Sequence, residues 1–382
     1  IFHINSTSKG GGVAEMLKSQ IALEKDLGLD SRWLVIKPRI EFFLITKKIH
    51  DFLQGEKGSL TEEEKNLYLT ESEKIDIDLA KFFKKNKPDL IIIHDPQPML
   101  SGCNRLAEYE TILRLHVDLS KPNVSAFNFL KACAIKYDML IVSRNDYRPK
   151  WFSKEKTAII MPAIDPLSLK NKSLSLSTAR EILLFHGVNP KRPTISQISR
   201  FDPWKDPIGV VKAYYEARNE IPDLQLILVG FTQAADDLTA VETLTKVERY
   251  AKGDPLIFIF ASEKNLRDVN NDIFVNATQI ASDVVLQKSK REGFGLTVTE
   301  AMWKGKPVIG GDASGIKLQI KHGENGFLVS NHKDAAKYIV KLIKDNKLKA
   351  KIGKKAKKTV LQKFLLPRYI KENLEVYKKA MK

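Results

Sequence analysis

The chain has 382 residues, of which 43% are hydrophobic and 29% are charged, and its formal net charge is +17. This composition supplies enough apolar residues for a sizeable core, which excludes a disordered or fibrous protein, and the length predicts two or three domains. No apolar run approaches the ~18 residues of a membrane-spanning helix, so we expect no membrane partner.

Short apolar runs alternate with amphipathic stretches along nearly the whole chain. Apolar residues recur at helical spacing from Val13 to Leu27, and Gly28 follows as a stop signal. The apolar runs are typical of parallel strands buried on both faces, so the alternation predicts an α/β protein. The predicted strands are residues 1–5, 32–36, 90–94, 111–116, 139–143, 194–199, 224–229, 256–260, 283–287 and 307–309.

The strand–helix series runs twice, which predicts two doubly wound, Rossmann-like domains with parallel sheets. A polar stretch rich in Ser, Lys and Asn, residues 168–177, separates the two series. We therefore expect an N-terminal domain over residues 1–165 and a second domain over residues 166–366. Doubly wound sheets bind ligands outside the carboxyl ends of their strands, so two such domains facing each other would form one cleft.

The excess of positive charge lies in the C-terminal tail. Residues 331–382 hold 17 basic and 4 acidic side chains, whereas the rest of the chain is nearly balanced. Such a tail could bind nucleic acid or a membrane surface, or it could form the solvated faces of Lys-rich helices. We favour the second interpretation and expect no nucleic-acid partner, because few aromatic residues lie among the lysines.

Cys103 and Cys133 are the only cysteines. Two cysteines provide neither a disulfide framework nor a zinc site, so they favour a reduced, cytoplasmic setting.

The chain begins without Met and directly in a predicted strand, so we expect residues upstream of Ile1 to be missing.

A glycine-rich turn, Ser8 to Gly12, follows the first predicted strand and precedes a helix. Gly11 and Gly12 would let backbone N–H groups approach an anion at the helix N-terminus, where the helix dipole favours negative charge. The segment is neither a dinucleotide fingerprint nor a P-loop. A plain tight turn is an equally good interpretation.

The segment from Arg291 to Glu300 is the strongest local signal for a ligand site. It follows a predicted strand and precedes a helix that runs to Trp303. Glu292 and Glu300 could accept paired hydrogen bonds from vicinal hydroxyls, although an isolated pair of glutamates is more often surface charge. Between them lies a turn whose backbone N–H groups would suit a phosphate or a sugar hydroxyl. This turn consists of Gly293, Phe294, Gly295 and Leu296.

Two cations, Arg200 and Lys205, leave the first predicted strand of the second domain and enter a helix. At this spacing they could clamp a diphosphate, Arg with a planar fork and Lys as a point charge. Their position at the carboxyl end of a strand favours this interpretation over ordinary surface cations.

Polar residues also follow two neighbouring predicted strands of the first domain. His94, Asp95 and Gln97 follow one strand, and His116 and Asp118 follow the next. This placement indicates recognition of hydroxyl groups, although a lone histidine at a strand end is more often structural.

Asp76 and Asp78 form an Asp-x-Asp pair, which is the metal-binding motif of some sugar transferases. The pair does not follow a predicted strand and begins a helical pattern. We therefore interpret it as a helix cap and predict no metal-binding residues.

Together these motifs resemble the signature of retaining family-four glycosyltransferases, whose GT-B fold has two facing Rossmann-like domains. The glycine turn, the His116 position, the two cations and the paired glutamates occur in the family order. More narrowly, the chain resembles the trehalose glycosyltransferring synthases, which join a nucleoside-diphosphate glucose to free glucose. The segments that carry this closer resemblance are residues 10–15, 94–98, 116–120, 200–205 and 291–306.

The resemblance implies a role for each motif of the second domain. Arg200 and Lys205 would hold the donor diphosphate during catalysis. Glu300 would bind the ribose hydroxyls, and Glu292 would bind the glucose hydroxyls at the reacting end. The phosphate and sugar cradle would be completed by backbone N–H groups of Gly11, Gly12, Gly293, Phe294, Gly295 and Leu296.

The resemblance also assigns the first domain. His116 would act in catalysis by reaching the donor sugar near the reacting carbon, and Asp95, Gln97 and Asp118 are predicted for the acceptor pocket. In this family the products retain the donor's anomeric configuration without a protein nucleophile. Residues 367–382 are expected to form a helix that crosses back to the N-terminal domain.

Two related activities remain as alternatives: a trehalose phosphorylase that uses glucose 1-phosphate, and a hexosyltransferase with another acceptor. For the favoured synthase, UDP-glucose and ADP-glucose are both suitable donors. No cofactor is required for the chemistry, although a divalent cation such as Mg could bind with the donor diphosphate. A homodimer is compatible with the sequence. Ser314 departs from the family, because it stands where a glycine is usual.

Overall fold

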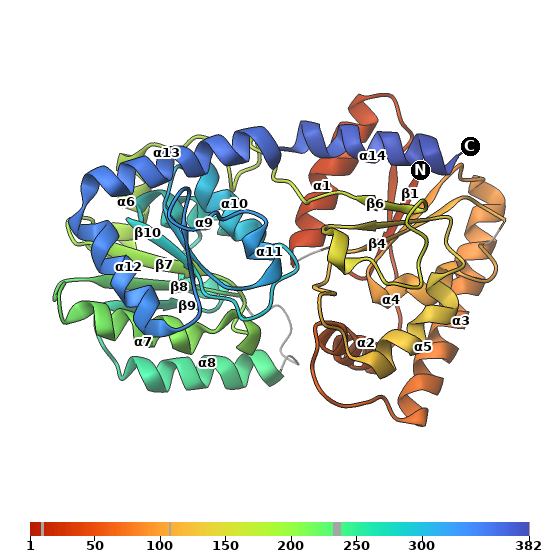
Figure 1. Ribbon diagram of the computed structural model, residues 1–382, viewed down its shortest axis with the longest axis horizontal. Helices are drawn as coiled ribbons and strands as arrows, with labels where there is room; N and C mark the ends of the chain where they lie inside the picture. Colours follow the sequence, from red (N-terminus) through yellow and green to blue (C-terminus); the bar gives the residue numbers. More distant parts are fainter. Residues whose placement is uncertain (9–10, 107, 232–237, 382) are drawn as a thin grey trace. The chain divides into compact units, whose positions relative to one another are not determined.

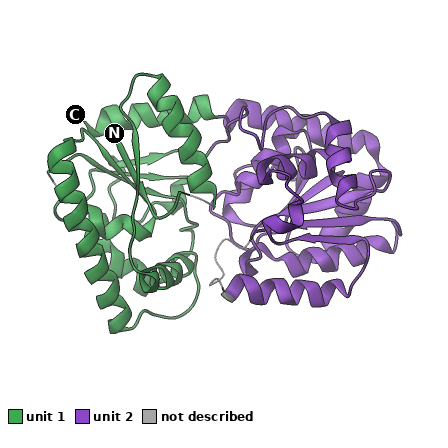
Figure 2. Ribbon diagram, turned by 180° about the vertical axis from the view of Figure 1, so that it is seen from behind, with its two compact units in different colours: residues 1–162, 366–382 green, residues 163–365 purple. Residues whose placement is uncertain are grey.

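A computed structural model describes residues 1–8, 11–106, 108–231 and 238–381 of the chain. The chain forms two compact units, each with its own parallel sheet and core (Figure 2). Unit 1 comprises residues 1–162 and 366–382, and unit 2 comprises residues 163–365. Helices flank both sheets, so the predicted fold class of two Rossmann-like, doubly wound domains is confirmed (Figure 1).

The sheet of unit 1 has six parallel strands in the order β2-β1-β3-β4-β5-β6. The central strands are apolar and buried on both faces, as the parallel arrangement requires. The bounds are β1 Phe2–Asn5, β2 Arg32–Val35, β3 Ile91–His94, β4 Thr111–Leu115, β5 Met139–Val142 and β6 Thr157–Ile159.

The sheet of unit 2 also has six parallel strands, in the order β12-β11-β10-β7-β8-β9. Strands β7 and β10 are neighbours in this sheet although about 90 residues separate them in the chain. Their carboxyl ends therefore lie side by side. The bounds are β7 Thr194–Ile198, β8 Gln225–Val229, β9 Ile257–Phe260, β10 Val284–Gln287, β11 Val308–Gly311 and β12 Phe327–Val329.

Helices connect the strands in both units. In unit 1 they are α1 Gly11–Asp26, α2 Ile40–Leu53, α3 Glu62–Asn86, α4 Pro96–Met99, α5 Val124–Ala134 and α14 Leu366–Ala380, with the short 3₁₀ turns η1 Leu100–Gly102 and η2 Asn145–Tyr147. In unit 2 they are α6 Leu176–Phe185, α7 Pro207–Arg218, α8 Leu238–Ala251, α9 Asn271–Ala281, α10 Leu296–Trp303, α11 Ser314–Lys317, α12 His332–Lys344 and α13 Asn346–Lys363, with η3 Pro203–Lys205 and η4 Glu263–Leu266.

All ten predicted strands are present, with ends that differ by one or two residues. The helix predicted from Val13 onward is α1, and Gly28 follows its end with a φ of +88°, which only glycine adopts easily. Strands β6 and β12 were not predicted. Each has three residues and lies at a sheet edge, where a strand does not need a long apolar run.

The interpretation of Asp76 and Asp78 as a helix cap is wrong. Both residues lie in the interior of α3, whose N-cap is Thr61. Thr61 and Glu64 form a reciprocal capping box at this end. The Asp76 side chain is buried and accepts a hydrogen bond from the backbone N–H of Arg105 at 3.3 Å, so it is a structural residue.

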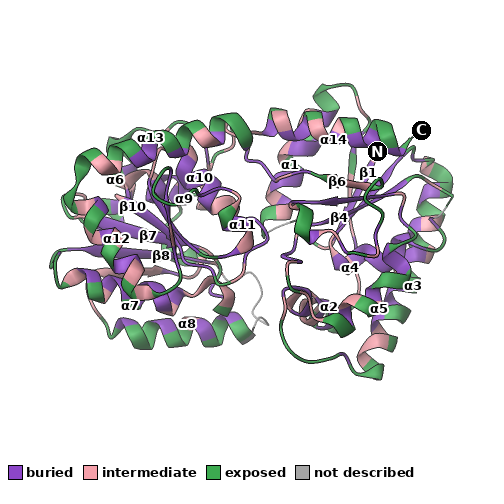
Figure 3. Cartoon of the chain, viewed as in Figure 1, coloured by how far each residue is buried: buried purple, intermediate pink, exposed green. Residues whose placement is uncertain are grey.

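The basic tail forms α12, α13 and α14. Figure 3 shows largely exposed outer faces on α12 and α13, where most of their lysines lie. Helix α14 belongs to unit 1 and packs against α1. Its buried residues include Tyr369 and Tyr377, and the Tyr377 hydroxyl donates a hydrogen bond to Glu24 on α1. Pro367 lies in the first turn of α14, where its missing N–H costs no hydrogen bond.

Tyr377→Phe is expected to destabilise unit 1 by about 1–3 kcal/mol, because it leaves a buried carboxylate with one donor fewer. The Tyr377 hydroxyl lies 3.0 Å from Glu24 Oε1 in a buried setting. Thermal unfolding checks the effect against Tyr338→Phe, which removes an exposed hydroxyl bonded to His322. Equal melting temperatures for the two variants would mean that α14 is not anchored to α1 in this way.

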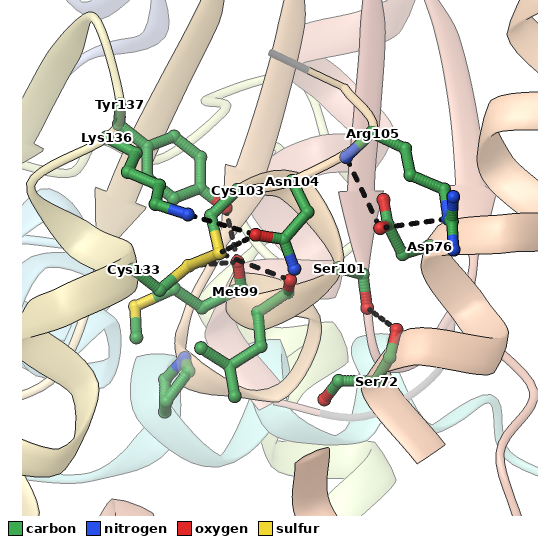
Figure 4. The surroundings of a disulfide bond; sticks show 12 residues. Ser72, Asp76, Met99, Ser101, Cys103, Asn104, Arg105, Cys133, Lys136 and Tyr137 are labelled. Atoms are coloured by element: carbon green, nitrogen blue, oxygen red, sulfur yellow. Dashed lines mark hydrogen bonds and ion pairs between the residues drawn. A yellow bond between two sulfur atoms is a disulfide. The ribbon is translucent and has the colours of Figure 1, made fainter. Parts of the chain in front are cut away.

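Cys103 and Cys133 form a disulfide, so the expectation of two reduced cysteines is wrong (Figure 4). The bond joins the loop after η1 to α5, and both cysteines are buried. The Cα atoms are 5.4 Å apart, a usual separation for a disulfide. The sequence could not reveal the pairing, because 30 residues separate the two cysteines.

Within the described ranges, no helix is both long and apolar enough to span a membrane.

Candidate active site

The strongest constellation in unit 2 is an ion pair between Lys205 and Glu292. The Lys205 Nζ lies 2.6 Å from the Glu292 Oε2, and both side chains are largely buried. Lys205 ends η3, which follows β7, and Glu292 lies in the loop that follows β10. Because β7 and β10 are adjacent parallel strands, their carboxyl ends bring together two residues that lie far apart in the sequence.

The backbone around Lys205 is fixed by hydrogen bonds from both strands. Gln197, on β7, donates from Nε2 to the Lys205 carbonyl at 3.0 Å and accepts the Lys288 N–H at 2.9 Å. The Lys290 N–H donates to the Trp204 carbonyl at 2.7 Å. The two loops are therefore tied together, which fixes the backbone from which the Lys205 side chain extends.

Arg200 occupies a more open position than Lys205. Its side chain is 50% exposed, and its guanidinium lies 3.3 Å from Asp202 Oδ2. Asp202 also caps η3 by accepting the Trp204 N–H at 2.9 Å. Arg200 thus lies at the same strand end as Lys205 but is not a partner of Glu292 in this structure. Its predicted role toward a diphosphate stays a prediction.

The glycine turn forms the N-terminal end of α10. Gly295 is the N-cap and has a φ of +87°, a conformation that other residues rarely adopt. The carbonyls of Phe294 and Gly295 accept hydrogen bonds from Gln319 Nε2 at 2.6 and 3.1 Å. With its carbonyls held on one side, the turn can direct backbone N–H groups at the helix N-terminus toward an anion.

A second glycine supports this turn from α11. The Gly315 N–H donates to the Glu292 carbonyl at 3.0 Å. A Cβ atom on Gly315 would lie 2.5 Å from the backbone of Gly293 and Phe294, which leaves no room for a side chain. Ser314, which stands where the family usually has a glycine, therefore lies next to Gly315, whose small size the turn requires.

Gly315→Ala is expected to displace the Gly293 turn and to lower kcat/KM by roughly 10- to 100-fold, because small misplacements of a preorganised site are costly. Gly323→Ala is the matched control: it strains another glycine of unit 2, with a φ of +76°, but its Cβ meets no atom within 4 Å. Steady-state kinetics of both variants check the prediction. Similar activities would show that the close approach of Gly315 is unimportant.

Glu300 lies within α10, eight residues beyond Glu292 in the sequence, and is only 2% exposed. Its Oε2 accepts a weak hydrogen bond from Gln279 at 3.5 Å. The nearby Lys304 bonds to Asn171 Oδ1 and to the Glu300 carbonyl, and burial lowers the pKa of its ammonium to about 8 despite the opposing attraction of Glu300. Glu300 is therefore a buried carboxylate that takes no part in the ion pair between Lys205 and Glu292.

Sequence reasoning missed Lys288 and Asp206, which form a buried ion pair beside Lys205. Asp206 also pairs with Lys290 at 3.2 Å and has a positive φ of 50°. The signal was present, because Lys288 directly follows the predicted strand that ends at Gln287. A buried lysine at a strand end next to a phosphate-type turn adds positive potential to this edge of the sheet.

In unit 1 the predicted residues also gather at neighbouring strand ends. Asp95 follows β3 with a φ of 66°, and its Oδ1 accepts the His116 backbone N–H at 2.7 Å. His116 follows β4, and its ring stacks on that of His94 with centroids 5.3 Å apart. Asp118 is buried and accepts the Ser120 N–H at 2.9 Å.

Burial dominates the ionisation of this cluster. It lowers the pKa of His94 and His116 well below the usual range, and positive neighbours including Arg114 add to the effect. It raises the pKa of Asp95 to about 7, although the hydrogen bond from His116 opposes the shift. Both histidines are therefore neutral at pH 7, and Asp95 can exchange a proton near that pH.

The structure describes some, but not all, of the remaining residues of unit 1 that the sequence pointed to. Gln97 lies in α4, partly buried. Gly11 and Gly12 begin α1, and Gly11 has a φ of +77°. Lys9 and Gly10, which belong to the same predicted turn, lie outside the described residues. The roles proposed for the glycines and for the acceptor residues are not tested by this geometry.

Two family models match the chain in the same order as its two units. Residues 3–149 match the N-terminal domain of trehalose synthase, and residues 180–359 match the glycosyl transferases of group 1. The trehalose synthase of Thermococcus litoralis is 43% identical over 98% of this chain and 89% of its own length. That of Rubrobacter xylanophilus is 38% identical over all of this chain and 90% of its own length.

The chain belongs to the trehalose synthase family of glycosyltransferases. It is accordingly a hexosyltransferase, as the motifs predicted. Trehalose phosphorylases are more distant relatives of this chain. The one from Pleurotus pulmonarius is 29% identical over 85% of this chain and 49% of its own length.

Solved structures support the GT-B fold of this family member. A glycosyltransferase from Rickettsia africae superimposes with a TM-score of 0.76 at 20% identity, covering all of this chain and 98% of its own. An Anabaena protein solved with UDP and glucose gives a TM-score of 0.72 at 19% identity, covering 99% of each chain. At these identities the likeness concerns the fold alone.

Proposed function

We propose that this protein transfers glucose from a nucleoside-diphosphate glucose, such as UDP-glucose or ADP-glucose, to free glucose and so forms trehalose. The single observation that carries the proposal is the identity of 43% to a trehalose synthase over 98% of the chain. The ion pair of Lys205 with Glu292 beside the glycine turn supports it, because it combines a phosphate-type cradle with a carboxylate for hydroxyls.

On this proposal the donor diphosphate lies against the Lys205 ammonium, Arg200 and the N–H groups that begin α10. As the glycosidic bond breaks, negative charge grows on the diphosphate and positive charge grows on the sugar ring. The fixed cations and the helix N-terminus stabilise the leaving group, which is usually the largest catalytic contribution. Glu292 faces the sugar hydroxyls, and the buried Glu300 meets the ribose.

The residues of unit 1 serve the sugars in this proposal. His116 contacts a hydroxyl of the donor sugar near the reacting carbon, and Asp95, Gln97 and Asp118 bind the acceptor. The product keeps the anomeric configuration of the donor, and no protein nucleophile takes part. The leaving phosphate removes the proton of the attacking acceptor hydroxyl.

A divalent cation such as Mg²⁺ is proposed to bind, when present, through oxygens of the donor diphosphate. Within the described ranges, no group of three or more His, Cys, Asp or Glu is arranged to hold a metal ion. We propose the cytoplasm as the compartment, because a chain with two cysteines relies on at most the single bond between Cys103 and Cys133. A homodimer also remains a proposal.

A donor screen tests the proposed function. The protein is incubated with glucose and, in turn, UDP-glucose, ADP-glucose or glucose 1-phosphate, and the sugar product and the released phosphate species are identified. Trehalose with release of a nucleoside diphosphate is the expected result. Trehalose only from glucose 1-phosphate, with release of inorganic phosphate, would identify a phosphorylase and refute the proposal.

A further inference from the structure

A row of hydrogen-bonded side chains crosses unit 1 and ends at His116. Glu24 Oε2 lies 3.0 Å from His3 Nε2. His3 Nδ1 lies 3.0 Å from His94 Nε2, and His94 Nδ1 lies 3.0 Å from His116 Nε2. The three rings are stacked with successive centroids 5.3 Å apart. Glu24, His3 and His94 are each at most 1% exposed.

The strand register explains why the three rings line up. Strands β1, β3 and β4 are neighbours in the sheet. His3 pairs with Ile92, two residues before His94, and His94 pairs with Arg114, two residues before His116. A shift of two residues keeps a side chain on the same face of a strand. The row is therefore built into the register of the sheet.

The Glu24 end of the row is anchored by helices α1 and α14. Glu24 Oε1 accepts hydrogen bonds from Gln20 Nε2 at 2.8 Å and from the Tyr377 hydroxyl at 3.0 Å. Burial alone would raise the pKa of Glu24, but its hydrogen bonds with His3 and Gln20 lower it to about 2. Glu24 is thus a carboxylate, which accepts hydrogen bonds and cannot donate them.

When the three rings are neutral, an acceptor at one end sets the direction of every hydrogen bond in the row. His3 must donate from Nε2 to Glu24, so its Nδ1 is an acceptor when the ring is neutral. His94 then donates from Nε2 to His3, and His116 donates from Nε2 to His94. The remaining nitrogen of His116, Nδ1, keeps its lone pair. As a residue His116 is only partly buried, and the structure shows no hydrogen bond from a described residue to its Nδ1.

A neutral row fits the charges that surround it. The buried Arg114 guanidinium already carries a positive charge beside these rings, so a second buried cation is disfavoured. Near a sugar ring that becomes positive in the transition state, an imidazolium would also be repelled, whereas a neutral acceptor would not. The hydrogen-bond direction and the charge argument therefore favour the same state of His116.

We propose that Glu24, His3 and His94 are positioning residues that hold His116 as a neutral imidazole protonated at Nε2, so that Nδ1 accepts a hydrogen bond from a sugar hydroxyl. The identity of this hydroxyl as a sugar group rests on the proposed function. The tautomer of His116 itself does not, and it can be measured in the resting protein without any turnover.

Nitrogen-15 NMR of the histidine-labelled protein tests the tautomer directly. His116 resonances are assigned by their loss in His116→Gln. A protonated, pyrrole-type Nε2 and an unprotonated, pyridine-type Nδ1 are expected. A proton on Nδ1, in either the other neutral tautomer or the imidazolium, would overturn the proposal. Absence of trehalose formation would refute the proposed function but would leave this readout unchanged.

Two pairs of variants separate positioning from mere packing. The glutamine amide of Glu24→Gln can donate as well as accept, so the hydrogen bonds of the row could run in either direction. We therefore expect a mixture of His116 tautomers and a kcat at least tenfold lower, with a smaller change in KM. Tyr369→Phe is the control, because it removes only a buried hydroxyl bonded to Gln20. Equal losses of kcat in the two variants, or an unchanged tautomer in Glu24→Gln, would overturn the proposal.

His94 offers a rescue experiment. In His94→Asn the amide oxygen can take the place of Nδ1 and accept from His116 Nε2, whereas His94→Leu offers no acceptor. We expect the asparagine variant to keep the tautomer and at least ten times the kcat of the leucine variant. The proposal fails if the two folded variants have the same tautomer and the same kcat.

Discussion

Glu292→Gln is expected to lower kcat about 100-fold with a much smaller change in the KM for the donor. The Glu292 carboxylate follows β10, is bonded to Lys205 at 2.6 Å and accepts the Ser289 hydroxyl at 3.2 Å. In the proposed function, its charge offsets the positive character that grows on the sugar ring only as the glycosidic bond stretches. The amide keeps the shape but loses the charge, so the transition state suffers more than the bound substrate.

Glu300→Gln should behave in the opposite way, with a raised donor KM and a kcat near that of the wild type. The ribose that Glu300 is proposed to bind does not change during the reaction, so its contacts are equal in ground and transition states. Glu324→Gln, an exposed glutamate paired with Lys321, is the control. Steady-state kinetics decide: the reverse pattern would exchange the roles of Glu292 and Glu300, and wild-type kinetics in both would remove the segment from the active site.

Lys205→Met is expected to weaken the binding of UDP or ADP about 100-fold, because it removes a largely buried cation aimed at the diphosphate. Calorimetric titration of the nucleotides measures the loss. Lys317→Met, which breaks a surface pair with Asp312 at 2.8 Å, is the matched control and should bind normally.

The ion pair with Glu292 complicates this substitution, because the lone carboxylate could itself repel the nucleotide. The double variant Lys205→Met with Glu292→Gln separates the two effects. If the Lys205 charge holds the diphosphate, affinity stays low in the double variant. Recovery of affinity to near the wild-type value would show that Lys205 acts only by neutralising Glu292.

The sequence predicted which strand each site residue follows, but it did not predict which strands are neighbours in the sheet. Arg200, Lys205 and Glu292 were each placed after a strand from local apolar runs and glycines. The contact of Lys205 with Glu292 depends on the pairing of β7 with β10, which a fold resemblance implies and a local pattern does not. Lys288 was missed because a lone lysine at a strand end reads as an exposed cation until its burial is known.

The histidine row was beyond sequence reasoning for a similar reason. His3 lies within an apolar run and His94 ends one, and a histidine in either position is usually structural. Only the two-residue stagger among β1, β3 and β4 places them in line with His116. Asp76 and Asp78 were misinterpreted although a local signal existed, because Thr61 and Glu64 form the capping box that starts α3 well before them.

The most direct test of the central claim is to follow the two glucose units separately. The protein is incubated with unlabelled UDP-glucose or ADP-glucose and with carbon-13-labelled free glucose, and the disaccharide is analysed by NMR. We predict trehalose in which one ring is labelled and the ring from the donor keeps its anomeric configuration, with one nucleoside diphosphate released per trehalose. A labelled disaccharide of another linkage, an inverted donor ring, or no incorporation from either nucleotide sugar would contradict the proposed function.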